Sequence, residues 1–246
     1  MLKSKGDEME LYDEIIRNTR EYLSAYTPRC YPYDEKKCWE ETASGEMIML
    51  RDAAFELGGG NCESVNYTCV TSALDGAGKN EVLLYGPELS ELKGDVSFAR
   101  IVFLTADPSV WEGLDEEAAY RFIRDLEYVR YHVYPRGYMV RTSAKSSREQ
   151  ARVSREALKA GISFEKLGAV YIRKYLQNRG IQSVQVLFLT GLDSLIPFQK
   201  EAGQAEAVTE ALNHILKGMP MNCGTCDLKV ICDEVEGMRA LHQKKR

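Results

Sequence analysis

The sequence lacks any apolar run close to the about 20 residues that a membrane-spanning helix requires. Its beginning, Met1–Glu8, contains no apolar core and does not resemble a signal peptide. A surplus of positive charge is also missing, because 32 Lys and Arg against 37 Asp and Glu give a net charge of −5. We therefore expect a cytoplasmic protein that neither crosses a membrane nor binds nucleic acid through its phosphates.

The motifs of common hydrolases and nucleotide-binding proteins are absent as well. The three histidines (His132, His214 and His242) form no HExxH motif and no Ser-His-Asp order. The triple glycine at 58–60 lacks the spacing of a phosphate-binding loop and the Lys-Ser/Thr that follows one, so we interpret it as a tight turn. Internal repeats and long linkers are absent too, which favours one domain over two.

Apolar periodicity predicts an α+β fold: a single compact domain with a mixed sheet flanked by helices. Strands are expected at 47–55, 64–72, 81–85, 100–105, 138–142, 151–153 and 182–190, with the last one buried. Helices are expected at 11–26, 115–131, 154–160, 163–176, 204–216 and 233–242, and Ser163 is the expected N-cap of the fourth. We divide the chain into an N-terminal helix and cysteine-containing loop (1–46), the α+β domain (47–218) and a C-terminal cysteine motif with a helix (219–246).

The seven cysteines lie towards the two ends of the chain, with none between Cys69 and Cys223. In a reducing compartment such cysteines are free thiols or metal ligands rather than disulfides. The spacing Cys223-x2-Cys226-x5-Cys232 indicates a metal site, because a two-residue separation allows two thiolates to bind one metal or cluster. Three unbound, reduced thiols are the alternative interpretation.

A cluster of the 4Fe–4S type and a structural zinc ion both require four ligands, so one ligand must come from elsewhere in the chain. Cys30 and Cys38 fall in an expected aromatic loop at 31–39 and its approach, and Cys62 follows the glycine turn. Cys69 lies inside an expected strand and ranks last among the cysteines, while His242 is a further alternative. We expect an iron–sulfur cluster, with zinc as the alternative metal.

A basic stretch between residues 136 and 159 indicates a second kind of site. Arginine side chains there can bind the phosphates of a nucleotide-like ligand such as coenzyme A. The alternative is a solvated surface that acidic residues balance elsewhere. The basic residues are Arg136, Arg141, Lys145, Arg148, Arg152, Arg155 and Lys159.

Several segments, in the same order and spacing, resemble the acetyl-CoA synthase subunit of the CO dehydrogenase/acetyl-CoA synthase complex. The resemblance covers about residues 47 to 190, the family's middle domain, and Cys223 falls where the family's metal-bearing domain begins. The matching runs are Glu56–Gly59 (ELGG), Ser64–Thr71 (SVNYTCVT), Glu81–Leu89 (EVLLYGPEL), Arg152–Ala157 (RVSREA), Gly161–Phe164 (GISF), Leu167-Gly168 and Val184–Val186 (VQV).

The resemblance implies a cluster of the 4Fe–4S type whose ligand set begins at Cys223 and Cys226. Cys232 comes sooner than the family's third cysteine, the fourth has no counterpart downstream, and the Cys-Gly-Cys that holds the outer nickel in the family is absent from this sequence. It also implies a surface for coenzyme A at Arg152 and Arg155, although Gln150 and Ala151 stand where the family carries a tryptophan.

The resemblance therefore implies an acetyl-CoA-synthase-like protein of anaerobic one-carbon metabolism without the complete nickel site. It would act with a partner such as CO dehydrogenase or a corrinoid protein. The alternative is a non-catalytic accessory or binding module whose thiols are structural or hold zinc.

Overall fold

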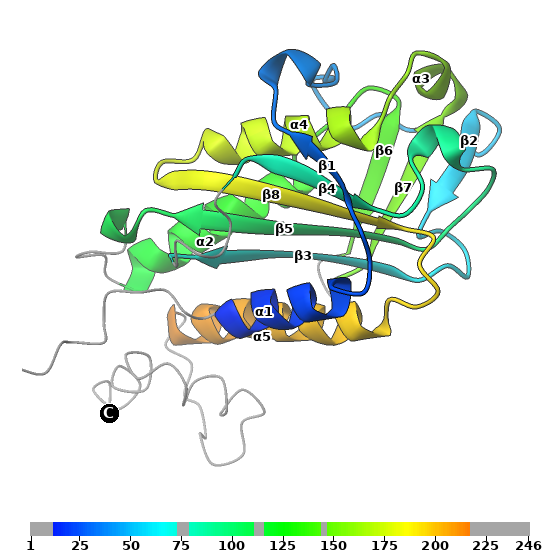
Figure 1. Ribbon diagram of the computed structural model, residues 1–246. Helices are drawn as coiled ribbons and strands as arrows, with labels where there is room; N and C mark the ends of the chain where they lie inside the picture. Colours follow the sequence, from blue (N-terminus) through cyan, green and yellow to red (C-terminus); the bar gives the residue numbers. More distant parts are fainter. Residues whose placement is uncertain (1–11, 73–78, 111–115, 144–146, 217–246) are drawn as a thin grey trace, which may run out of the picture.

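A computed structural model describes residues 12–72, 79–110, 116–143 and 147–216 and shows an α+β fold (Figure 1). Its main feature is a five-stranded mixed sheet with the strand order β1-β4-β8-β5-β3. The strands are β1 (Arg29–Pro32), β3 (Ser64–Thr71), β4 (Glu81–Tyr85), β5 (Phe98–Ala106) and β8 (Ile181–Thr190). Among the described residues, no helix combines the length and the apolar character that a membrane crossing requires.

The two longest strands form the centre of this sheet. β8 pairs antiparallel with β5 and parallel with β4, and β5 pairs parallel with β3. Every residue of β5 is buried, and β8 is exposed only at Gln182 and half-buried only at Gln185. β5 is mostly apolar and β8 is apolar throughout 186–189, as expected for strands covered on both faces. The prediction that 182–190 forms a buried strand is thus confirmed.

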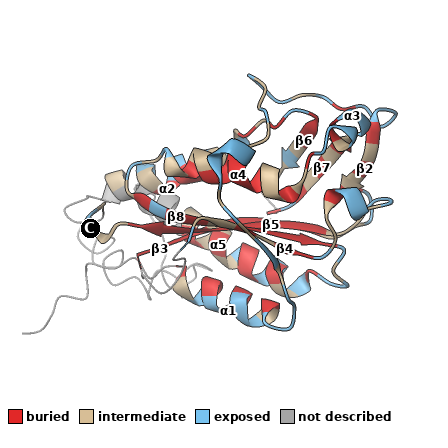
Figure 2. Ribbon diagram, turned by 45° about the horizontal axis from the view of Figure 1, so that its top comes forward, coloured by how far each residue is buried: buried red, intermediate tan, exposed pale blue. Residues whose placement is uncertain are grey.

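Helices cover both faces of the sheet. α4 (Phe164–Leu176) lies on one face, and α1 (Asp13–Leu23) and α5 (Ile196–Leu216) lie side by side on the other (Figure 1). The helices bury the sides that face the sheet and expose their outer sides (Figure 2). α2 (Glu116–Tyr131) packs against both α4 and α5. The Ser163 side chain accepts a hydrogen bond from the Lys166 amide, which confirms it as the N-cap of α4.

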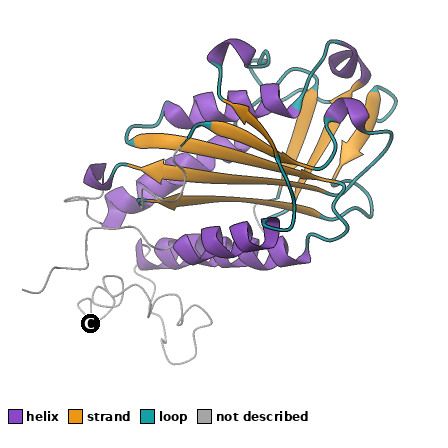
Figure 3. Cartoon of the chain, viewed as in Figure 1, coloured by secondary structure: helices purple, strands orange, loops and turns teal. Residues whose placement is uncertain are grey.

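A second, three-stranded antiparallel sheet has the order β2-β7-β6 and lies beside the first (Figure 3). Its strands are β2 (Ala53–Leu57), β6 (Tyr138–Thr142) and β7 (Glu149–Ser154), and the short helix α3 (Arg155–Lys159) follows β7. The glycine turn after β2 leads into β3, and Gly58 and Gly60 adopt positive φ angles of 63° and 58°. A tight turn therefore occupies this segment, as the sequence predicts.

Three sequence-based boundaries differ most from the structure. The expected loop at 31–39 instead begins with the end of edge strand β1 and then contains a 3-10 turn at Glu35–Lys37. The strand expected at 47–55 begins only at Ala53, because a turn at 50–52 precedes it. Helix α5 begins at Ile196 rather than at 204. The helix expected at 233–242 lies outside the described residues.

Candidate functional site

The structure separates the cysteines of the first third of the chain. Cys30 is exposed on β1, Cys38 is half-buried at the end of the 3-10 turn, Cys62 is half-buried before β3, and Cys69 is fully buried in β3. β1 and β3 are opposite edges of the sheet, four strand spacings or roughly 19 Å apart. Cys30 and Cys62 therefore cannot bind the same cluster.

Burial also distinguishes these thiols chemically. It raises the pKa of the Cys69 thiol well above its usual range, with a further rise from the Glu201 and Asp13 carboxylates. It raises the pKa of Cys38 as well, although Arg173 opposes that shift. A metal binds the thiolate, so burial disfavours Cys69 and Cys38 as metal ligands. The expected ligands Cys223, Cys226 and Cys232 lie outside the described residues.

Within the described segments, no group of three His, Cys, Asp or Glu residues is placed to hold a metal ion. Of the described thiols, Cys30 is exposed on β1 and Cys62 is half-buried in a surface turn, so both are accessible.

The basic stretch is divided between structural ion pairs and exposed side chains. Arg152 forms an ion pair with Glu56, its register partner on β2, and also donates to the Ile48 carbonyl at 3.0 Å. Arg136 pairs with Glu40 at 3.2 Å. Arg155 is exposed at the start of α3. A phosphate that binds Arg152 would thus have to displace Glu56.

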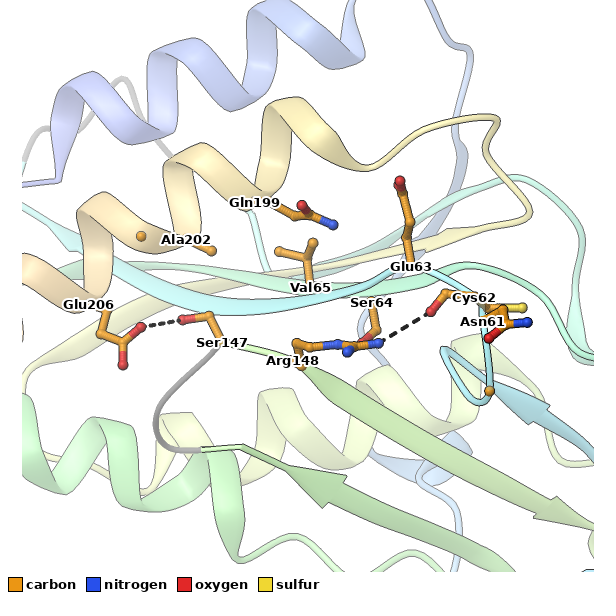
Figure 4. A pocket seen from close by; sticks show the side chains of 12 residues that line it. Asn61, Cys62, Glu63, Ser64, Val65, Ser147, Arg148, Gln199, Ala202 and Glu206 are labelled. Atoms are coloured by element: carbon orange, nitrogen blue, oxygen red, sulfur yellow. Dashed lines mark hydrogen bonds between the residues drawn. The ribbon is translucent and has the colours of Figure 1, made fainter.

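A cavity lies between the glycine turn, the residues before β7 and helix α5 (Figure 4). Its volume is about 500 Å³, which lies within the usual range for small-molecule sites. Arg148 spans its floor and donates to the Ser64 hydroxyl at 3.3 Å and the Cys62 carbonyl at 3.5 Å. On the opposite side, Ser147 donates to Glu206 of α5 at 3.3 Å.

A smaller cavity of about 170 Å³ continues from the first along β3. The two cavities share Ser147, Ala202 and Glu206, and together they form a groove beside the β3 edge. The backbone amide of Asn66, on β3, donates to the Ser147 carbonyl at 2.7 Å. Arg130, on α2, lines the smaller part.

A buried polar cluster lies beneath this groove, and the sequence did not predict it. Arg100 donates to Glu149 through Nε at 2.8 Å and Nη2 at 2.5 Å, and Asn66 donates to the same carboxylate at 2.5 Å. Arg130 donates to the Asn66 carbonyl at 2.8 Å. The only sequence signal was one arginine inside the otherwise apolar run at 98–106.

No protein-family model matches the chain, and no curated protein matches it either.

Proposed function

We propose that the chain is an acetyl-CoA-synthase-like protein of anaerobic one-carbon metabolism that binds an iron–sulfur cluster and acts with a partner protein. The observation that carries this proposal is the Cys223-x2-Cys226-x5-Cys232 spacing, which follows a region that resembles the middle domain of that family. The cluster would supply electron transfer or a binding site for a further metal. Coenzyme A is a proposed ligand of the surface around Arg155.

Cys62 is the proposed fourth ligand, because it combines accessibility with a position beside α5. Gly203 lines the same cavity as Cys62, and α5 rises about 20 Å from there to Leu216. The seven residue steps from Leu216 to Cys223 span at most about 25 Å. The covalent chain is therefore long enough for the cysteine motif to meet Cys62.

Anaerobic reconstitution with iron and sulfide tests this proposal. The wild-type protein should turn brown and bind iron, and Cys226→Ser and Cys62→Ser should each lose most of it, with a lower melting temperature. Cys30→Ser is the matched control, because it removes an exposed thiol at the opposite sheet edge and should keep the full iron content. Full iron retention in Cys226→Ser, or a colourless protein that holds zinc, would contradict the proposal.

A non-catalytic accessory module is the second candidate, and the state of Arg152 favours it. The Arg152 side chain is already bound to Glu56 and Ile48, and the sequence lacks the outer nickel ligands of the resembled family. Gel filtration of the reconstituted protein with purified CO dehydrogenase or a corrinoid protein separates the candidates. Co-elution that requires the cluster supports the first function, and cluster-independent co-elution supports the accessory role.

A further inference from the structure

The cavity of about 500 Å³ is hollow because small residues form its walls. Ala202 and Gly203 of α5 face Ser64 and Ser147 across it. A Cβ atom added at Gly203 would meet no atom within 4 Å, so the helix leaves open space there. Filling this space would require no change of backbone, which makes Gly203 a suitable position for testing whether the cavity is used.

Two opposite charges line this cavity without neutralising each other. Arg148 donates only to the neutral oxygens of Ser64 and Cys62, and Glu206 accepts only from the Ser147 hydroxyl, as far as the described residues show. In Figure 4 the Arg148 side chain points away from Glu206, with Ser147 between them. Some arginines elsewhere in the fold do pair with a carboxylate, as Arg29 does with Glu91 and Arg173 with Glu41.

The segment that presents these charges has a strained backbone. Ser147 has a φ angle of 45°, and it is the single non-glycine residue with positive φ among the described residues. Such a conformation costs about 1–3 kcal/mol and is found preferentially at functional sites. Here it directs the Ser147 carbonyl to the Asn66 amide and the hydroxyl to Glu206, while Arg148 follows on the cavity floor.

We infer that this cavity binds a small zwitterion of the amino-acid class, with its carboxylate on Arg148 and its ammonium group on Glu206. A guanidinium binds a carboxylate through two parallel hydrogen bonds. A simple anion would lie near the carboxylates of Glu63 and Glu206, and a simple cation would lie near Arg148. The Glu63 carboxylate accepts a hydrogen bond from the Leu195 amide and points away from Arg148 and Ser147 in Figure 4, so we assign the ammonium group to Glu206.

This inference does not depend on the proposed iron–sulfur cluster. Cys62 contributes its carbonyl oxygen to Arg148, while its sulfur points away from the cavity in Figure 4. A metal on that sulfur and a ligand in the cavity would thus occupy different spaces. The binding experiment is therefore performed on reconstituted wild type and on Cys226→Ser. Iron content then reports on the proposed cluster, and ligand binding reports separately on the cavity.

Isothermal titration calorimetry with each free proteinogenic amino acid at millimolar concentration tests the inference. Acetate, phosphate and methylamine serve as probes that carry one charge only. We expect at least one amino acid to bind more tightly than any of these three, in both protein forms. Arg148→Gln and Glu206→Gln should each weaken that binding roughly 10- to 100-fold, the loss expected for one charge-assisted hydrogen bond.

Gly203→Phe should abolish binding by filling the cavity, while Gly203→Ala should retain it, and circular dichroism checks that both variants fold. Arg51→Gln is the matched charge control, because this arginine is exposed in the turn before β2 and does not line the cavity, and the variant should bind as wild type does. The inference is overturned if no amino acid binds, or if Gly203→Phe binds the amino acid as wild type does. It is also overturned if phosphate binds as tightly as the best amino acid and Glu206→Gln leaves amino-acid binding unchanged.

Discussion

Arg100 and Glu149 form a two-point ion pair that connects the two sheets, and neither side chain is exposed to solvent (0% each). Arg100 lies on β5 of the five-stranded sheet, and Glu149 begins β7 of the three-stranded sheet. The guanidinium also lies 4.1 Å from the centre of the Tyr171 ring of α4. One ion pair thus fixes how the two sheets and α4 meet.

The surroundings keep Arg100 charged. Burial lowers the pKa of Arg100, but the Glu149 carboxylate and the Tyr171 and Tyr175 side chains outweigh that effect, so its pKa lies above the usual value. Thr142 and Asn66 also donate to Glu149. A carboxylate with this many donors becomes costly to bury once its cationic partner is removed.

Replacement of Arg100 by Met should therefore lower the free energy of unfolding by about 3–5 kcal/mol, because it leaves the Glu149 charge buried and unpaired. Urea denaturation measures the change. Arg29→Met is the matched control: its ion pair with Glu91 is exposed, and the loss should stay below about 1 kcal/mol.

The double variant Arg100→Met/Glu149→Leu separates the charge effect from packing. It should recover part of the stability lost in Arg100→Met, since no unpaired charge remains buried. Equal stability of Arg100→Met and wild type would show that this ion pair does not connect the sheets energetically.

The sequence predicts the central strands and most helices because burial leaves a local pattern. The strands at 81–85 and 138–142 have the expected limits, and burial of Cys69 within its strand is confirmed. β1 was missed because its four residues are mostly exposed and join β4 through backbone hydrogen bonds, so they carry no apolar periodicity. Cys30 therefore lies on a strand rather than in the expected approach to a loop.

The candidate site was less predictable, because its residues meet through long-range folding. Arg100 and Glu149 are 49 positions apart, and each taken alone indicates a solvated charge. The cavity combines residues near 62, 148 and 203, and only the basic character of Arg148 was visible beforehand. Arg148 has no carboxylate partner among the described residues. Which side chains lie near it depends on how the strands pair, and the local sequence pattern does not reveal that pairing.

Gly168 allows α4 to approach β4 closely. A Cβ atom at this position would lie 2.3 Å from Val82 Cγ2, so Gly168→Ala should lower stability by about 1–3 kcal/mol through overpacking. Gly203→Ala is the matched helical control: its Cβ meets open space, and it should raise stability by about 0.5–1 kcal/mol. Thermal unfolding of the two variants should shift in opposite directions, and shifts of the same sign would contradict this packing argument.

Arg152 is expected to act on stability through its bonds to β2 and Ile48. Arg152→Met removes the ion pair with Glu56 and the hydrogen bond to the Ile48 carbonyl, which should cost about 1.5–3 kcal/mol. Arg155→Met, three residues later and exposed, should change stability by less than about 0.5 kcal/mol. If urea denaturation gives equal values for the two variants, Arg152 does not stabilise the small sheet.

Glu88 should make the protein more stable in mild acid. Burial raises the pKa of Glu88, although the Phe164 and Leu89 amides, each 2.8 Å from its carboxylate, oppose the shift. The folded chain therefore binds this proton more tightly than the unfolded chain, and ionisation of Glu88 costs stability as the pH rises through its folded pKa. Between about pH 7 and about pH 5, acidification should stabilise wild type relative to Glu88→Gln.

Glu91 provides an internal control of opposite sign, only three residues away. Its hydrogen bonds with Arg29 and the Glu88 amide lower the pKa of Glu91, so its contribution is present at neutral pH and is lost as the pH falls through that lowered value. Urea midpoints of wild type, Glu88→Gln and Glu91→Gln across this pH range measure both effects. The advantage of wild type over Glu88→Gln should grow on acidification, and its advantage over Glu91→Gln should not. If the difference in urea midpoint between wild type and Glu88→Gln stays constant with pH, the pKa of Glu88 is not raised in the folded protein.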